Sequence, residues 1–198
     1  MEVDIVDSQE LCAKVIGNLE RRGFAAVYAP TAGEAVEMAL SFIPEGASVA
    51  WGGSVSVEES GLLSRVKSGN YRLFDRDTAR TPEERMEIMR KSLTADVFLT
   101  SFNAVSEDGV LLNIDGNGNR VSAVIFGAES VVALVGVNKI VATEADLEPR
   151  ALRIAAEKNA RRLSIEKAES ICAVFVRHRI CRPPSRIKII LVGEDLGY

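Results

Sequence analysis

Short apolar runs alternate with helical patterns along most of the chain, and this alternation restricts the fold more than any other feature. Residues 24–29 (FAAVYA) and 47–51 (ASVAW) are apolar and have the length of buried strands. Between them, residues 32–42 have helical spacing, and Thr31 with Glu34 forms the sequence pattern of a capping box. A strand, a helix and a strand in succession favour parallel pairing in a sheet that helices cover. The sequence therefore predicts an α/β fold.

The same alternation continues to the end of the chain. Leu11, Val15 and Leu19 recur at helical spacing and predict a first helix over about residues 8–22. Further helices are predicted over residues 54–66, from Thr81 to about residue 94, and from Thr143 to about residue 163. Further strands are predicted over residues 71–74, 97–101, 131–135, 173–180 and 187–192.

Length and composition are those of one domain spanning residues 1–198. Of the 198 residues, 47% are hydrophobic and 26% charged, which is enough apolar material for a core and excludes a disordered chain. The three cysteines form no CxxC pair, so neither a disulfide scaffold nor a zinc ribbon is expected. The apolar stretches are strand-sized and the start of the chain is acidic. We therefore predict no transmembrane helix, no signal peptide and a cytoplasmic location.

Charge is distributed unevenly along the chain. Residues 1–149 carry 13 Lys+Arg and 23 Asp+Glu, a net charge of −10, whereas residues 150–198 carry 11 and 5, a net charge of +6. The basic part is either a solvated helix face with strand-edge arginines or a surface for an acidic partner. Nucleic-acid binding is not expected, because the whole chain has a net charge of −4 and lacks a basic run with interleaved aromatic residues.

A glycine and serine motif follows the second predicted strand. Gly52, Gly53, Ser54 and Ser56 stand where this strand gives way to the helix predicted over residues 54–66. Glycines let the backbone approach an anion, the N–H groups of a helix N-terminus point at it, and serine hydroxyls add donors. The motif therefore predicts a site for a phosphate, a pyrophosphate or a carboxylate. A tight strand-to-helix turn is the alternative that the residues leave open.

A second polar motif, NAVSEDG, follows the strand predicted over residues 97–101. Ligands of open α/β sheets bind beyond the carboxyl ends of the strands, so Asn103 is a candidate ligand-binding residue. Glu107, or Asp108 beside it, is a candidate nucleophile or general base. The structural alternative is that Glu-Asp-Gly simply forms the turn before a hairpin.

Two basic residues also stand at predicted turns. Apolar runs over residues 110–114 and 121–126 flank the sequence DGNGN, which predicts a β-hairpin. Arg120, at the base of this turn, is suited either to binding an anion or to an internal ion pair. Asn138 and Lys139 follow the fully apolar strand VVALV and are candidates for contact with the same ligand, but the residues leave open that Lys139 is a surface charge.

The histidine and the cysteines are predicted to have structural roles. His178 is the only histidine. A two-histidine metal site therefore lacks its ligands, a Ser-His-Asp triad has a single candidate histidine, and we predict no metal site. Cys12, Cys172 and Cys181 are predicted to be core residues.

Five segments carry a wider resemblance: WGGSVSVEESGLL, ADVFLTSFNAVSEDGVLLNIDGNGNRVSAVIFG, VGVNKIV, NARRL and ILVGEDLGY. Together they resemble the lactate-utilisation (LUD) domain family over nearly the whole chain from about residue 47. The resemblance implies a three-layer α/β sandwich of the type shared with phosphosugar isomerases and CoA transferases (NagB/RpiA/CoA-transferase-like). Such a fold has a mostly parallel central sheet with helices on both faces and a β-hairpin, in agreement with the periodicity.

One departure from the family bears on cofactors. Longer relatives carry a cysteine-rich stretch resembling a cluster-binding loop, where this chain has only residues 164–171. Cys172 aligns with the last of those four cysteines, or Cys181 does in an alternative register, and the other three are absent. The chain also has no recognisable flavin or nicotinamide motif. The resemblance therefore implies no cofactor in this chain, and iron–sulfur subunits of a lactate-oxidising system as candidate partners.

Three functions are compatible with these observations. The first is a non-redox accessory protein of lactate or organic-acid metabolism that binds a small anionic, phosphate-like or CoA-like ligand. The second is an enzyme that acts on a phosphorylated or CoA-linked substrate with Glu107 as base or nucleophile. Glu107 is, however, one residue further from Gly109 than the corresponding glutamate is from its glycine in the CoA-transferase pattern. The third is an interaction subunit whose basic C-terminal part docks an acidic partner. The oligomeric state stays open, a homodimer included.

Overall fold

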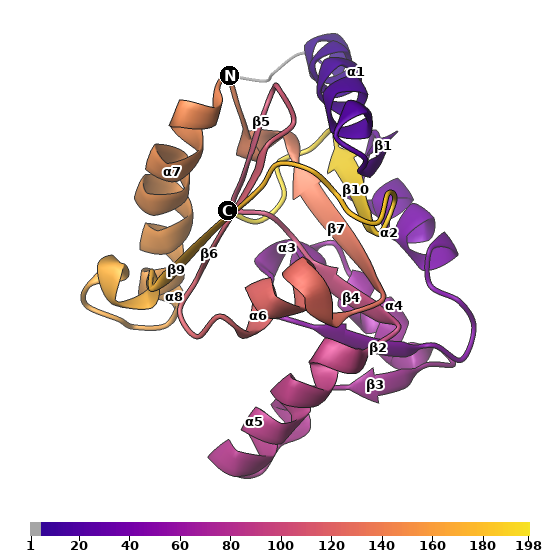
Figure 1. The fold of residues 1–198 in the computed structure, drawn as a ribbon, viewed down its shortest axis with the longest axis vertical. Coiled ribbons are helices and arrows are strands. Elements are labelled where there is room, and N and C mark those ends of the chain that lie inside the picture. Colours follow the sequence, from indigo (N-terminus) through magenta and orange to yellow (C-terminus); the bar gives the residue numbers. More distant parts are fainter. Residues whose placement is uncertain (1–4) are drawn as a thin grey trace.

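The computed structural model describes residues 5–198, which form two β-sheets (Figure 1). In the larger sheet, the main sheet, every neighbouring pair of its six strands is parallel. Its order is β1 (Ala25–Ala29), β10 (Ile187–Val192), β7 (Ser130–Gly136), β4 (Val97–Thr100), β2 (Ser48–Trp51) and β3 (Arg72–Phe74). The central strands are buried almost throughout, as expected of a parallel sheet that is covered on both faces.

Helices cover both faces of the main sheet. One face packs against α2 (Ala32–Ser41), α3 (Val55–Glu59) and α4 (Leu62–Ser68). The other packs against α1 (Ile5–Arg21) and against α6 (Asn119–Ser122) with the π-helical turn Ala123–Gly127 that extends it. Helix α5 (Pro82–Lys91) has no buried residue and projects beside β3 (Figure 1). No helix in the described part of the chain has both the length and the apolar character needed to cross a bilayer.

The smaller sheet lies on the α1 side of the main sheet. Its order is β8 (Ile140–Val141), β5 (Ala104–Ser106), β6 (Leu111–Asp115) and β9 (Val174–His178). Val105 and Leu111 face the core shared with α1, whereas Ala104 and Leu112 face a helix near the C-terminus. That helix, here called the C-terminal helix, consists of α7 (Leu147–Arg150), a π-helical segment (Ala151–Ala156) and α8 (Glu157–Arg162). The smaller sheet is therefore a layer between the main sheet and the C-terminal helix.

The fold class predicted from the sequence is confirmed. The structure has a parallel central sheet with helices on both faces, and the predicted strands of this sheet form within a few residues of their expected bounds. Local signals also place the helix ends. Thr31 Oγ1 accepts the Glu34 N–H at 3.2 Å, and Thr143 with Asp146 forms a complete capping box.

The hairpin predicted around DGNGN is wrong. Asp115 Oδ1 accepts the N–H groups of Asn117 and Gly118, both at 3.1 Å, and the chain then enters α6 instead of a second strand. Both edges of β6 are already paired, with β5 and with β9. The hairpin is formed by β5 and β6, and Gly109, with a φ of +86°, belongs to its turn.

The single helix predicted over residues 54–66 is also wrong. Gly61 has a φ of +83°, which a continuous right-handed helix does not allow, and it separates α3 from α4.

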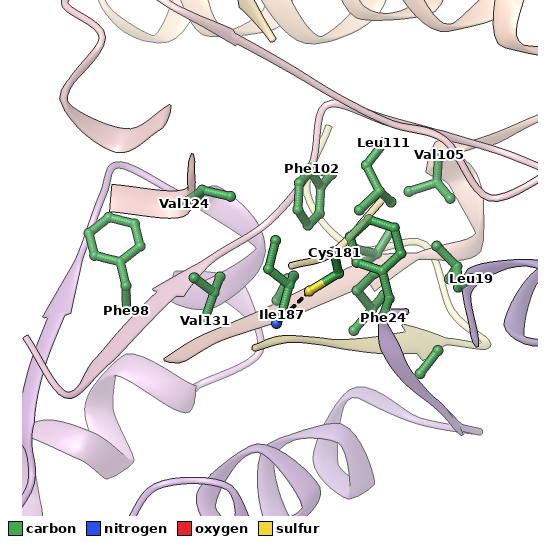
Figure 2. Close-up of a cluster of buried hydrophobic side chains, with 14 of the residues drawn as sticks. Leu19, Phe24, Phe98, Phe102, Val105, Leu111, Val124, Val131, Cys181 and Ile187 are labelled. Atoms are coloured by element: carbon green, nitrogen blue, oxygen red, sulfur yellow. Dashed lines mark hydrogen bonds between the residues drawn. The ribbon is translucent and has the colours of Figure 1, made fainter. Parts of the chain in front are cut away.

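The core on the α1 side holds one of the cysteines. Figure 2 shows Cys181 among apolar side chains that include Phe24 and Phe102. Cys181 is buried, and its Sγ accepts the Ile187 N–H at 3.4 Å (Figure 2). His178 packs edge-on against Phe102 with ring centroids 5.6 Å apart. The predicted core role of Cys181 is confirmed.

Arg186 holds the end of the helical segment that begins with α6. Its guanidinium donates to the carbonyl oxygens of Ala123 at 3.1 Å, Val124 at 2.7 Å and Ala128 at 2.7 Å. Carbonyls at a helix end lack sufficient intrahelical donors, and a cation there also interacts favourably with the helix dipole. Arg186 therefore fixes the helical segment on which Arg120 stands.

We expect Arg186→Met to lower the free energy of unfolding by about 2–3 kcal/mol, because several charge-assisted hydrogen bonds are lost together. Arg186→Lys should restore only part of this loss, since an ammonium group cannot reproduce the guanidinium fork. Urea unfolding measures both changes. The control is Arg179→Met, which removes an exposed side chain with one 3.8 Å ion pair to Glu144, and its expected effect is within about 0.5 kcal/mol. Equal losses for Arg186→Met and the control would contradict the prediction.

Candidate functional site

Three segments that are distant in the sequence meet at one edge of the main sheet. Strands β2, β4 and β7 are parallel, and β4 lies between the other two, so the segments that follow them leave the sheet at the same edge. Ser54 and Ser56 follow β2, Ser101 follows β4 and Lys139 follows β7. A pocket opens here, and we call it the strand-end pocket. Its polar lining side chains are Ser54, Ser56, Ser101, Asn103, Arg120, Lys139, Asn159, Arg162 and Tyr198.

Lys139 lies at the base of the pocket. The residue is 2% exposed, and its Nζ donates to Ser56 Oγ at 2.6 Å and to Ser101 Oγ at 2.9 Å. Burial lowers the pKa of Lys139 from 10.5 to about 7, and the positive charges of Arg150 and Arg120 act in the same direction, while Glu59 opposes them. Lys139 is therefore a buried amine that titrates near neutral pH.

Arg120 forms one side of the pocket. Its side chain is 13% exposed, and Nε lies 3.4 Å from Asp115 Oδ2. Nη2 donates to Asn103 Oδ1 at 3.2 Å and to the Ile114 carbonyl. Burial lowers the pKa of Arg120, and the negative charge of Asp115 partly offsets this. Arg120 thus makes the internal ion pair that the sequence left open and also lines the pocket.

The C-terminal helix supplies the opposite side. Ala151, Ala155 and Ala156 form an apolar wall there. Nearer the mouth, Arg162 Nε donates to Tyr198 Oη and Arg162 Nη2 donates to Asn159 Oδ1, both at 2.9 Å. An adjoining depression shares Gly53, Arg120, Asn159 and Arg162 with this pocket and extends to Arg76. Positively charged side chains therefore lie at the mouth of the pocket as well as at its bottom.

The two glycines make room for arginines. A Cβ on Gly52 would lie 3.1 Å from Arg120 Cγ, and a Cβ on Gly53 would lie 3.0 Å from Arg76 Nη2. Such distances are shorter than ordinary carbon contacts, so a side chain at either position would displace a cation. Gly53 lines the pocket, whereas Gly52 lies behind Arg120.

Arg150 supports the site from behind. It is 9% exposed, Nη1 donates to the Asn103 carbonyl at 2.5 Å, and Nη2 donates to the Asn138 carbonyl at 3.0 Å. Burial lowers the pKa of Arg150 to about 10. Asn103 precedes β5 and Asn138 follows β7, so Arg150 connects the C-terminal helix to the ends of both sheets.

Three predicted site residues, Gly52, Glu107 and Asn138, do not line the pocket. Glu107 lies beyond β5 at the hairpin turn, where its carboxylate is 2.5 Å from Lys14 Nζ of α1. The three residues of β5 separate Asn103 from Glu107 and lead the chain away from the pocket, so the prediction that these two residues share a site is wrong. The interpretation of Glu-Asp-Gly as the turn of a hairpin is confirmed. The Asn138 amide binds the C-terminal segment, accepting from the Leu196 N–H at 3.2 Å and donating to a carbonyl at 3.0 Å.

Sequence reasoning missed several residues of the pocket. Ser101 is the last residue of the strand predicted over residues 97–101, so the strand-end signal that pointed to Asn103 applied to it as well. Asn159 and Arg162 are three residues apart and share a helix face, but only the tertiary structure shows which way that face points. No periodicity or turn pattern indicated Tyr198, although it ends the segment ILVGEDLGY that carries the family resemblance.

The cysteines do not fit a shared metal cluster. In residues 5–198, no three His, Cys, Asp or Glu side chains lie together in an arrangement that would hold a metal ion. Cys12 and Cys181 are buried in the core, and Cys172 lines the pocket with its Sγ 3.3 Å from the Ala168 carbonyl. Cys172 is half-buried, so its predicted core role gives way to a place in the pocket wall.

Lys139 should make the stability of the chain depend on pH. The folded chain releases the Lys139 proton near pH 7 and the unfolded chain near pH 10.5, so between these values the unfolded state binds more protons and stability rises with pH. We expect the free energy of unfolding of the wild type, minus that of Lys139→Met, to increase from pH 7 to 9 by up to about 1.4 kcal/mol per pH unit.

Urea unfolding at a series of pH values measures this difference. The matched control is Lys91→Met, because Lys91 is an exposed lysine paired with Glu87, and its difference from the wild type should stay constant over the same range. A Lys139→Met difference that is equally constant would contradict the titration of Lys139 near pH 7.

Comparisons with known proteins give one solved structure with the same fold and one matching family. A search of curated proteins gave no significant match. Among solved structures, a DUF162 family protein from Deinococcus radiodurans has a TM-score of 0.61 at 12% sequence identity, covering 93% of this chain and 98% of that one, and so shares its fold. The eIF2B delta structure from Chaetomium thermophilum has a TM-score of 0.36 (16% identity, 69% and 53% covered). Ribose 5 phosphate isomerase A from Neisseria gonorrhoeae has one of 0.35 (14% identity, 67% and 67% covered). The LUD domain matches residues 12–192, which is most of the chain, and the protein therefore belongs to the LUD domain family.

Proposed function

We propose that this chain binds a small anion in the strand-end pocket and has a non-redox accessory role in lactate or related organic-acid metabolism. The ligand would carry a phosphate or carboxylate group. The observation that carries the proposal is the charge of the pocket. Lys139, Arg120 and Arg162 line it, and none of the described residues lining it is Asp or Glu.

The positive charge of the pocket is only partly offset within the chain. Asp115 lies 3.4 Å from Arg120, but in the described residues neither Lys139 nor Arg162 forms an ion pair with a carboxylate. Lys139 is buried whereas Arg162 is exposed. Holding a buried cation without counter-charge is unfavourable, and an anion would relieve that cost through charge-assisted hydrogen bonds. Serine hydroxyls and the Asn103 side chain add neutral polar groups for orientation.

Membership of the LUD domain family supports the metabolic context. Because the cysteines present do not fit a shared cluster, we assign electron transfer in such a system to separate iron–sulfur subunits. An enzyme with Glu107 as its base is less well supported, since Glu107 is outside the pocket and paired with Lys14.

A thermal-shift panel tests the anion site. Phosphate, lactate, pyruvate, phosphosugars, CoA and nucleotides are added separately to the full chain. A ligand present at about one hundred times its Kd stabilises the folded state by about 2.7 kcal/mol, which gives a clear shift. We expect at least one phosphate or carboxylate compound to produce it. Failure of the whole panel would contradict the proposal and favour the interaction subunit.

Removal of one cation should weaken that binding. We expect Arg120→Met to raise the Kd of the stabilising compound at least about tenfold, which corresponds to the loss of roughly 1.5–3 kcal/mol for a hydrogen bond to a charged group. Titration calorimetry measures the change. Arg153→Met is the matched control, because Arg153 is an exposed arginine of the C-terminal helix outside the pocket lining. The same loss of affinity in both variants would mean that the effect is general to the charge of the chain.

Glu107→Gln separates the proposal from the enzyme alternative. We expect this variant to bind the same compound with unchanged Kd, because the Glu107 carboxylate does not line the pocket. A marked loss of binding, measured by the same calorimetry, would restore Glu107 to the site.

A further inference from the structure

The two hydrogen bonds of Lys139 are oriented in a definite way. Ser56 Oγ donates its own proton to the Leu196 carbonyl at 3.2 Å, and Ser101 Oγ donates to the Phe102 carbonyl at 3.4 Å. Each hydroxyl therefore turns a lone pair toward Lys139 and accepts an N–H from it. Two positions on the Lys139 nitrogen are occupied in this way.

One position of the tetrahedral nitrogen is left for the pocket. Within the described chain, Nζ has no third hydrogen-bond acceptor and no carboxylate partner, and Lys139 lines the pocket. In the ammonium form this position is an N–H, and in the amine form it is a lone pair. The groups that face Lys139 are Arg120 from α6, Arg150 from α7 and Glu59 from α3, and burial with the two arginines favours the amine.

We propose that Lys139 Nζ forms an imine with a small carbonyl compound that carries an anionic group. This rests on the proposed function, because Arg120 and Arg162 of the same pocket would hold the anionic group. An anionic group held by these arginines brings its neighbouring carbonyl carbon into the same pocket as the free position of the nitrogen. Compounds with a carboxylate (2-oxo acids) and with a phosphate (phosphorylated ketones) share this chemistry.

The step balances without an oxidant or a reductant. The amine attacks the carbonyl carbon, a C–N bond forms, and the carbonyl oxygen takes up a proton that the nitrogen releases. The product is a carbinolamine. Its C–O bond then breaks, and the oxygen leaves as water with one proton taken from solvent. A protonated imine on Lys139 remains.

Reductive trapping tests the proposal. The full chain is incubated with pyruvate in one arm and with dihydroxyacetone phosphate in the other, in the presence of sodium cyanoborohydride, which reduces an imine to a stable amine. We expect one arm to add the mass of the probe minus one oxygen atom, and peptide mapping to place it on Lys139. The productive arm shows whether the anionic group is a carboxylate or a phosphate. Yield should rise from pH 6 to pH 8 as the amine form increases.

Two variants and a binding measurement make the outcome decisive. Lys139→Met should lose the adduct, and Lys91→Met, which removes an exposed lysine of α5, should keep it. The peptide map of the wild type gives the same answer if Lys139→Met does not fold. A probe that stabilises the chain without labelling Lys139 would overturn the imine and leave the anion site standing. A chain that is neither stabilised nor labelled by either probe would count against both.

Discussion

Parallel pairing of β2, β4 and β7 is the constraint on which the site depends. Each connection between parallel strands returns the chain to the edge of the sheet where the strands begin, so the three strands all end at the opposite edge. Ser56, Ser101 and Lys139, which follow these strands, therefore meet there. Both faces of the strands are covered, so polar groups are confined to the segments beyond their ends. The same covering removes Lys139 from water, which is why the site can hold an amine near neutrality.

Cations in this protein have two distinct tasks. Arg150 and Arg186 donate to backbone carbonyls and fix, respectively, the C-terminal helix and the helical segment of α6. Lys139 and Arg120 face the pocket that those elements enclose. Both Arg150 and Arg186 belong to the basic part of the sequence, residues 150–198, so a share of its positive charge has an internal explanation and does not require an acidic partner.

The main sheet was predictable because buried parallel strands are short apolar runs, and Ile187–Val192 forms a strand with the predicted bounds. Prediction failed at DGNGN, where the same residues suit a hairpin turn and a left-handed entry into a helix, and only the pairing of β6 decides between them. The strand-end rule found Lys139 but does not say how far beyond a strand the site extends, so it also included Glu107. The place of Arg162 in the pocket could not be predicted, since the orientation of a helix face depends on what the helix packs against.

The apolar wall of the pocket consists of methyl groups. Ala151, Ala155 and Ala156 lie on the π-helical segment, and their side chains carry no polar atom. In evolutionary terms, this apolar wall is therefore encoded on a different element from Lys139 and from Arg120. Exchange of one alanine for a larger residue alters the size of molecule that fits while the cations at the base stay in place. Descendants of this chain can thus change the size of the pocket by single substitutions and inherit its cations unchanged.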